Sequence, residues 1–151
     1  MGYRFTGITN ALIAWPGKGT RVIERSKRVL EVKECPHGRG VFSKSKFGVG
    51  GLIQTAENLA ITTTPKSPPW KRWALIIGET PEGKRLFWDE EDERSVNYWS
   101  NFLDHSREAN VRFLIDAKKR TARLIATRSI DAGEELFLDY KEYDPANWAP
   151  D

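Results

Sequence analysis

Residues 132–140 read AGEELFLDY, and this stretch near the end of the chain decides how the rest is interpreted. A glycine turn at 131–133 precedes the apolar residues Leu136-Phe137-Leu138, which predict a short strand. Tyr140 stands at the predicted end of that strand, where a tyrosine taken alone is most often an ordinary core or strand-end residue. The stretch therefore predicts a turn and a strand, and any chemistry at Tyr140 depends on the segments before it.

The preceding segments predict a succession of short strands and turns. Two pairs of strands are expected to form hairpins, and the one helix expected is short, over 93–102. Many short strands with little helix predict a mostly β fold. β-branched and apolar residues between turn residues place the strands at 29–33, 40–43, 52–64, 73–77, 84–88, 111–116 and 121–126.

The composition describes one globular domain. The chain has 151 residues, of which 39% are hydrophobic and 30% charged, enough for one core and too few for two typical domains. Cys35 is the single cysteine, which excludes an internal disulfide and a cysteine-rich zinc site. No apolar run approaches the ~18 residues that span a bilayer, and residues 1–14 lack a signal-peptide pattern. We therefore expect a soluble intracellular protein without a membrane partner.

Charge is spread unevenly along the chain. Residues 1–50 carry 10 Lys and Arg against 3 Asp and Glu, whereas residues 89–93 are all acidic. The basic third could contact nucleic acid peripherally, but no nucleic-acid motif accompanies it, and a solvated face is the simpler interpretation. The acidic run belongs on a loop or a helix start, where it either attracts a basic peptide or only solubilises the surface.

Common catalytic and metal signatures are missing from the sequence. No Walker-type phosphate loop, GxGxxG or GxSxG motif occurs. His37 and His105 lie far apart, without the spacing of an HExxH or Cys/His site. The residues therefore predict no metal ion.

Four segments, in this order, resemble the motifs of the SET-domain family of protein lysine methyltransferases. Residues 38–42 (GRGVF) resemble its glycine motif, and 101–111 (NFLDHSREANV) is similar to its RFxNHSxxPN segment. Residues 126–130 (ATRSI) resemble the strand before the last motif, and 132–140 matches AGEELxxDY closely. The resemblance covers about residues 29–143.

The resemblance implies a SET-domain fold, in which several small β-sheets surround a knot-like C-terminal segment. It implies one domain over residues 1–151, with an N-terminal extension at 1–28 and a SET core at 29–140. That core contains a variable insert at about 65–97, and an aromatic tail follows at 141–151.

The resemblance also implies methyl transfer from S-adenosylmethionine to the side-chain amine of a lysine in a protein, leaving S-adenosylhomocysteine. Free lysine has a pKa near 10.4, so a dry channel that disfavours the ammonium is needed to supply the neutral amine. Tyr140 would be the catalytic residue, because its hydroxyl aligns the amine with the methyl group. A basic segment such as a histone tail would suit the acidic run at 89–93 in the insert.

The family pattern assigns further residues to this site. Gly38 and Gly40 would let the backbone approach the cofactor's methionine portion, while Asp104 and His105 would hold its amino and adenine ends. The residues expected to bind the cofactor are Gly38, Arg39, Gly40, Asn101, Phe102, Asp104, His105 and Trp148, and those expected to line the substrate channel are Phe137, Leu138 and Tyr143.

The sequence departs from the family pattern in two places. Asp104 replaces the usual Asn, while Asn101, Arg107 and Ala109 stand where Arg, Cys and Pro are common. A carboxylate at 104 can accept hydrogen bonds from the cofactor's ammonium, so we expect binding with an altered affinity.

The second departure concerns the end of the chain. Many members carry a cysteine-rich, zinc-binding segment after the last motif, and here no cysteine follows Cys35. We therefore expect no zinc, and an aromatic lid of Tyr143 and Trp148 in place of that segment.

Three alternatives stay open at this point. The chain is a catalytically silent SET-like binding module, a lysine methyltransferase that acts on a non-histone protein, or a small basic β protein that binds nucleic acid. The expected cellular compartment depends on the organism: the nucleus in a eukaryote and the cytoplasm in a bacterium.

Overall fold

The computed structural model describes residues 29–66 and 74–143, which form short strands and two 3₁₀ helices. The prediction of a mostly β chain is confirmed, and the hairpin strands predicted at 111–116 and 121–126 have the predicted bounds. The elements are β1 (Leu30–Cys35), β2 (Gly38–Ser43), β3 (Leu52–Glu57), β4 (Ile61–Thr62), β5 (Leu75–Glu79), β6 (Arg85–Trp88), η2 (Tyr98–Phe102), β7 (Asp104–His105), β8 (Val111–Asp116), β9 (Thr121–Ala126), β10 (Glu135–Leu138) and η3 (Tyr140–Glu142).

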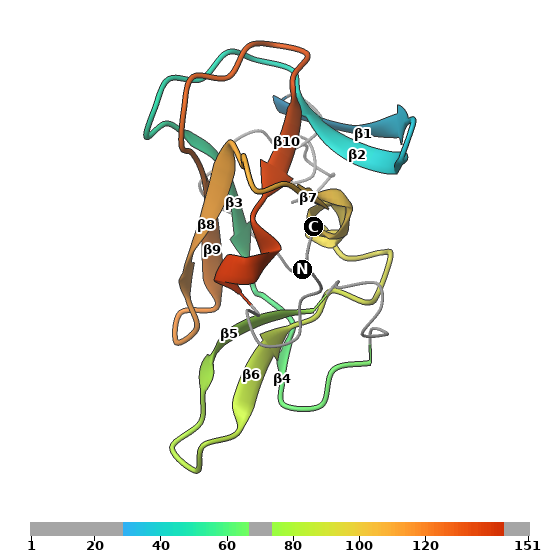
Figure 1. Cartoon of the computed structure of the whole chain (residues 1–151). Helices are drawn as coiled ribbons and strands as arrows, with labels where there is room; N and C mark the ends of the chain where they lie inside the picture. The colour runs from blue at the N-terminus through green and yellow to red at the C-terminus, as the bar shows by residue number, and fades with distance from the viewer. Residues whose placement is uncertain (1–28, 67–73, 144–151) are drawn as a thin grey trace, which may run out of the picture.

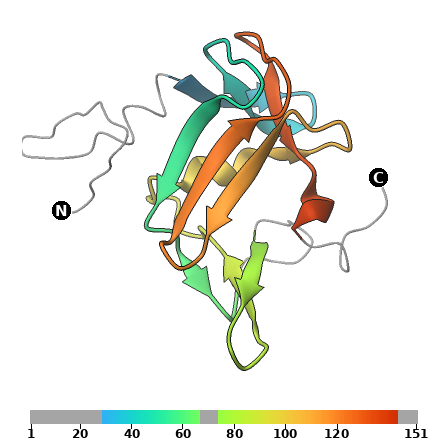
Figure 2. The same cartoon turned by 90° about the vertical axis from the view of Figure 1, so that its left-hand side faces the viewer.

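The strands form three small sheets (Figure 1). One has the order β1-β2-β10-β7, the second β3-β9-β8, and the third β4-β6-β5. Figures 1 and 2 show the third sheet at one end of the molecule, where the β5–β6 hairpin extends away from the other two sheets. The first two sheets therefore form the body in which the predicted motifs must meet.

Strand β10 lies inside the first sheet although it forms near the end of the described chain. Glu135 and Leu136 pair with β2 in the antiparallel sense, and Phe137 and Leu138 pair with β7 in the parallel sense. Figure 1 shows β10 between these two strands. The first, second and last predicted motifs therefore lie side by side.

The side chains of β10 alternate between the buried core and a partly exposed face. Successive side chains of a strand point to opposite faces. Leu136 and Leu138 are buried in the core, while Glu135 and Phe137 are only partly buried. The same short strand therefore anchors the fold with one face and supplies polar chemistry with the other.

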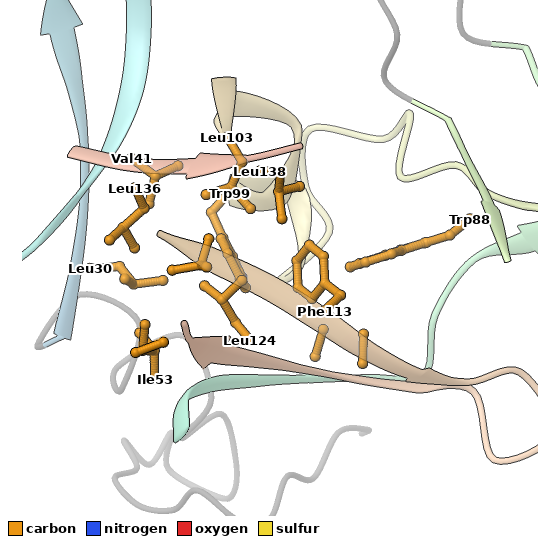
Figure 3. Close-up of a cluster of buried hydrophobic side chains, with 14 of the residues drawn as sticks. Leu30, Val41, Ile53, Trp88, Trp99, Leu103, Phe113, Leu124, Leu136 and Leu138 are labelled. Carbon is orange, nitrogen blue, oxygen red and sulfur yellow. The ribbon is translucent and has the colours of Figure 1, made fainter. Parts of the chain in front are cut away.

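The hydrophobic core takes residues from all three sheets (Figure 3). Phe113 of β8 packs edge to face against Trp88 of β6, with ring centroids 4.9 Å apart. Full burial of such a side chain contributes about 1.5–3 kcal/mol. The largest fully buried side chains are Ile53, Leu59, Leu103, Leu124, Ile130, Leu136, Leu138, Gln54, Val41 and Val111.

The predicted helix over 93–102 is wrong in length and in type. Only Tyr98–Phe102 is helical there, and it is a 3₁₀ helix. In the preceding residues side chains satisfy the backbone, because Asp92 accepts the Arg94 N–H and the Ser95 hydroxyl accepts the Asn97 N–H. Such local bonds compete with helical hydrogen bonds, so these residues form turns.

The acidic run at 89–93 is not simply a solvated surface. Asp89 and Glu90 are only 5% and 4% exposed. Glu90 accepts the backbone N–H of Ala60 at 3.0 Å and the indole N–H of Trp88 at 2.8 Å. The expectation of a solubilising or peptide-attracting run is therefore wrong for these two residues, because they satisfy buried donors. The other three acidic residues are exposed.

Some predictions fall outside the described residues. These are the N-terminal extension at 1–28, the part of the insert at 67–73, and the tail from 144 onward, including Trp148. Within the described ranges, no helix has the length and apolar character needed to cross a membrane.

Candidate functional site

The β1–β2 turn forms one side of the site. Pro36 and His37 connect Cys35 to Gly38, which pair across the hairpin. Gly38 has a φ of 114° and nothing lies within 4 Å of the position its Cβ would take. This backbone conformation strongly favours glycine, and the space beside it is open to a ligand.

Gly40 faces a side chain instead of open space. A Cβ at this position would collide with the carboxylate of Glu135, which occupies the space beside the backbone. The predicted close approach of a cofactor to Gly40 stays a prediction. The contact with Glu135 depends on the pairing of β2 with β10.

Four polar side chains from separate segments meet next to these glycines. Cys35 ends β1, His37 lies in the β1–β2 turn, Asp104 comes from β7 and Glu135 from β10, and we call this cluster the polar junction. His37 Nδ1 lies 3.1 Å from Asp104 Oδ2, and His37 Nε2 lies 3.1 Å from Glu135 Oε1. Cys35 Sγ is 3.4 Å from His37 Nε2. Sequence spacing gave no signal for this cluster, because three distant segments build it.

The carboxyl group of Asp104 has an unusual environment. Burial raises its pKa to about 6, and Glu135 adds to the rise while His37 opposes it. Glu135 Oε2 is buried and lacks a hydrogen-bond donor within the described residues, and the buried Asp104 Oδ2 faces His37 Nδ1 at 3.1 Å without the geometry of a hydrogen bond. Because unsatisfied buried acceptors are costly, this side of the site favours a ligand with positive charge or N–H donors.

Asn110 fixes β10 against the loop that follows β7, a role the sequence analysis missed. Its side chain is fully buried, its Nδ2 donates to the Glu135 carbonyl at 2.9 Å, and its Oδ1 accepts the Phe137 N–H at 2.8 Å. The only sequence signal was its place at the end of the second motif. Both ends of the amide are used, so Asn110 sets the register that brings Glu135 to the polar junction.

His105 positions Tyr140. Its Nδ1 accepts the backbone N–H of Tyr140 at 3.1 Å, and the two rings lie 5.3 Å apart. An accepting Nδ1 places the proton of the neutral ring on Nε2. The predicted role of His105 at the adenine end of a cofactor stays a prediction, and the imidazole demonstrably supports the predicted catalytic residue.

Tyr140 stands at a narrow pocket on the core side of β10. Its hydroxyl donates a hydrogen bond to the Leu103 carbonyl. Burial raises the pKa of Tyr140 far above its ordinary value, and Asp104 adds to this effect, so the phenol stays protonated at neutral pH. The pocket is lined by Leu75, Trp88, Glu90, Ser100, Asn101, Leu103, Leu138 and Tyr140.

A second, more open hollow lies on the loop after β7. It is lined by His105, Ser106, Arg107 and Glu108. His105 therefore borders this hollow and also contacts Tyr140, which lines the narrow pocket.

The remaining predicted cofactor residues in the described chain are Arg39, Asn101 and Phe102. Asn101 Nδ2 donates to the Glu90 carbonyl at 2.7 Å, which ties η2 to the acidic run. The guanidinium of Arg39 lies 5.6 Å from the centre of the Phe102 ring. The structure therefore brings these three predicted residues near the site, and their contact with a cofactor stays a prediction.

The predicted channel residues divide between the two faces of β10. Leu138 lines the narrow pocket, whereas the Phe137 ring lies 6.3 Å from the His37 ring on the other face. The Tyr143 hydroxyl accepts the Phe113 N–H at 2.9 Å, and burial raises the pKa of Tyr143 to about 12. Tyr143 is thus held against β8, and its role as a lid stays a prediction.

Comparison with solved structures finds the same fold. A crystal structure of a candidate histone methyltransferase from Plasmodium falciparum superposes with a TM-score of 0.51 and 14% identity, over 75% of this chain and 93% of that one. The Ezh2-containing complex ctPRC2 in its apo form matches with a TM-score of 0.52 and 18% identity, over 79% of this chain and 15% of that one. No curated protein matches the chain.

A comparison with protein families decides the assignment. The model of the SET domain matches residues 38–141, from the glycine motif to the residue after Tyr140. This range contains the paired strands β2, β7 and β10 and both openings described above. The chain belongs to the SET-domain family.

Proposed function

We propose that this protein transfers a methyl group from S-adenosylmethionine to the side-chain amine of a lysine in a protein substrate. The observation that carries the proposal is the position of Tyr140, a protonated phenol between a narrow pocket and the loop of the second motif. Membership of the SET-domain family supports the reaction class. The substrate and the cofactor are part of the proposal.

The residues present fit the proposed cofactor. The buried Asp104 Oδ2 is an acceptor that suits an ammonium group, and open space lies beside Gly38. The hollow along residues 105–108 offers room for a larger, partly exposed group. When bound, S-adenosylmethionine would supply an electrophilic methyl group on a sulfonium, held by Asp104, Gly38 and this loop.

Tyr140 would act by orientation. Because its O–H donates to the Leu103 carbonyl, the phenolic oxygen can accept an N–H from an incoming amine. A tyrosine whose pKa is raised by burial does not remove a proton at neutral pH, so it is not the general base. Alignment of two reactants can supply several kcal/mol of the barrier reduction.

The narrow pocket would receive the lysine side chain once its walls move apart, because its free volume of about 10 Å³ holds little more than one water molecule. Leu75, Leu103 and Leu138 give it apolar walls that disfavour the ammonium and so lower the pKa of the lysine. Glu90 also lines the pocket, where both of its carboxylate oxygens already accept hydrogen bonds from the protein. The exposed acidic residues 91–93 lie next to Glu90 in the chain, which favours a substrate lysine in a basic segment such as a histone tail.

The test is transfer of labelled methyl groups to a panel of histones and other basic proteins. We expect Tyr140→Phe to lower kcat by ~10²-fold, as removal of one positioned polar group often does. Tyr98→Phe is the matched control, because Tyr98 packs against Phe102 and lines neither opening. Equal activity of Tyr140→Phe and the control would refute the role of Tyr140.

Cofactor binding separates this proposal from a silent binding module. Calorimetry should detect binding of S-adenosylmethionine to the wild-type protein. A folded protein that binds no cofactor would contradict the enzymatic function altogether. Binding without transfer to any protein in the panel would favour the binding module.

A further inference from the structure

The polar junction contains a set of side chains that commonly bind transition metals. It holds the chain's single cysteine, Cys35, and one of its two histidines, His37, together with the carboxylates of Asp104 and Glu135. Thiolate, imidazole and carboxylate are the three ligand types of protein zinc sites. Their meeting requires the β1–β2 turn, β7 and β10 to be in place at once.

The four side chains are close enough to share one ion. One potential ligand atom from each residue lies within 4.8 Å of those of the others. Zinc bonds of about 2.0–2.3 Å in a tetrahedron place neighbouring ligand atoms roughly 3.3–3.8 Å apart. From His37 Nε2, the distances of 3.1 Å to Glu135 Oε1 and 3.4 Å to Cys35 Sγ are already near this range, while Asp104 Oδ2 lies 3.1 Å from the other ring nitrogen, Nδ1.

The junction carries more negative charge and more acceptors than its own donors satisfy. The His37 ring faces both carboxylates, one from each nitrogen. In the described part of the chain Glu135 Oε2 is nevertheless buried without a hydrogen-bond donor, and the contact between His37 and Asp104 Oδ2 lacks hydrogen-bond geometry. A bound cation would satisfy these oxygens directly, because an ionised carboxylate can bind a metal through either of its two oxygens.

The hydrogen bonds of His37 also suit metal binding. A metal-bound histidine usually donates its second ring nitrogen to a carboxylate, which fixes the ring. In the junction an ion at Nε2 would face Cys35 and Glu135 and leave Nδ1 to donate to Asp104, so Asp104 would hold the ring. Cys35 and His37 flank Pro36 in a tight turn, so two ligands are held together by local structure.

We propose that Cys35, His37, Asp104 and Glu135 form a binding site for one thiolate-preferring divalent cation such as Zn²⁺. The thiolate and imidazole select against Mg²⁺ and Ca²⁺, which take oxygen ligands. This site departs from the sequence-based expectation of no metal, which considered spacing along the chain and a cysteine-rich tail. It does not depend on the proposed methyl transfer.

The test is titration of the full chain with Co²⁺ and Zn²⁺ in a non-thiol reductant. Co²⁺ bound to a thiolate gives a charge-transfer absorption band, and any such band must come from Cys35. We expect a band that saturates at one Co²⁺ per chain and is abolished by added Zn²⁺. Calorimetry with Zn²⁺ gives the affinity independently.

Variants assign the ligands. Cys35→Ser should remove the band, and His37→Ala, Asp104→Asn and Glu135→Gln should each weaken Zn²⁺ binding by at least about 10-fold. Glu34→Gln is the matched control, because its side chain is 85% exposed on the same strand as Cys35 and lies outside the junction. Circular dichroism of each variant confirms that the fold is retained.

Two outcomes would overturn the site. One is the absence of a thiolate-to-cobalt band at saturating Co²⁺ in the reduced, folded protein. The other is Zn²⁺ affinity in Cys35→Ser and His37→Ala equal to that of Glu34→Gln, which would mean that the ion binds elsewhere. Because metal binding is read directly, neither outcome bears on the proposed methyl transfer.

Discussion

The β3-β9-β8 sheet and the polar junction are built in opposite ways. The sheet is formed largely by one local hairpin, β8–β9, and its inner side chains Phe113 and Leu124 are buried in an apolar core. The junction joins a turn, β7 and β10 from distant parts of the chain and leaves buried oxygens without donors. The comparison indicates that the sheet serves stability, whereas the junction holds unsatisfied groups that a ligand can satisfy.

The largest effect should come from a substitution that removes apolar contacts from the buried face of the β3-β9-β8 sheet. Phe113→Ala removes a ring that packs on Trp88 and Trp99, and should lower the free energy of unfolding by about 3–5 kcal/mol. Leu114→Ala, on the same strand but 40% exposed, is the control and should cost much less. Urea denaturation measures both, and equal losses would show that the sheet is not the main source of stability.

The next largest effect concerns ligands at the junction, and it rests on both proposals above. Asp104 cannot serve a cation and the cofactor's ammonium at once, so Zn²⁺ at 100 times its dissociation constant should raise the apparent Kd for S-adenosylmethionine about 100-fold. Cys35→Ser should remove this competition and keep cofactor binding. If calorimetry finds that bound Zn²⁺ leaves the affinity for the cofactor unchanged, the cation and the cofactor bind at different sites.

A smaller loss of stability is expected when the buried carboxylate of the acidic run, Glu90, is removed. Glu90→Ala leaves the donors of Ala60, Trp88 and Ser95 unsatisfied, and should cost about 1–3 kcal/mol. Glu91→Ala removes an exposed neighbour and should be nearly neutral. Thermal unfolding of the pair distinguishes a structural carboxylate from a solvated one, and equal melting temperatures would contradict the distinction.

The smallest effect is a pH dependence at the junction in metal-free protein. A carboxyl group whose pKa is raised from 3.8 to about 6 on folding contributes stability below pH 4 that is lost as the pH rises through 6. The charged or titratable groups facing Asp104 are Cys35 and His37 from the turn, Glu135 from β10, and Tyr140 from η3.

Asp104→Asn tests this dependence, because the amide does not titrate. Relative to wild type, the melting temperature of the variant should rise between pH 4 and pH 7 in the presence of a chelator. A constant difference across that range would mean that the pKa of Asp104 is not raised. Glu34→Gln, an exposed carboxylate on β1, supplies the baseline.

Sequence reasoning succeeded where neighbours in the chain decide the structure. The β8–β9 hairpin has the predicted bounds, and the motif at 132–140 led to the family that the comparison with the SET-domain model confirms. It failed over residues 93–97, where side chains from Asp92 and Ser95 replace helical hydrogen bonds. A helical pattern of apolar residues does not reveal that local competition.

The sequence by itself determined the family, the hairpins and the identity of Tyr140 as the residue of interest, because motif order and strand alternation are properties of neighbouring residues. Tertiary structure decided the chemistry around it. Only the insertion of β10 between β2 and β7 shows that Gly40 makes room for Glu135 and that Cys35 and His37 meet Asp104. The physical reason is that the burial of these side chains, their mutual electrostatic effects and the distances between them depend on strand pairing between distant segments. A pattern of neighbouring residues does not contain this information.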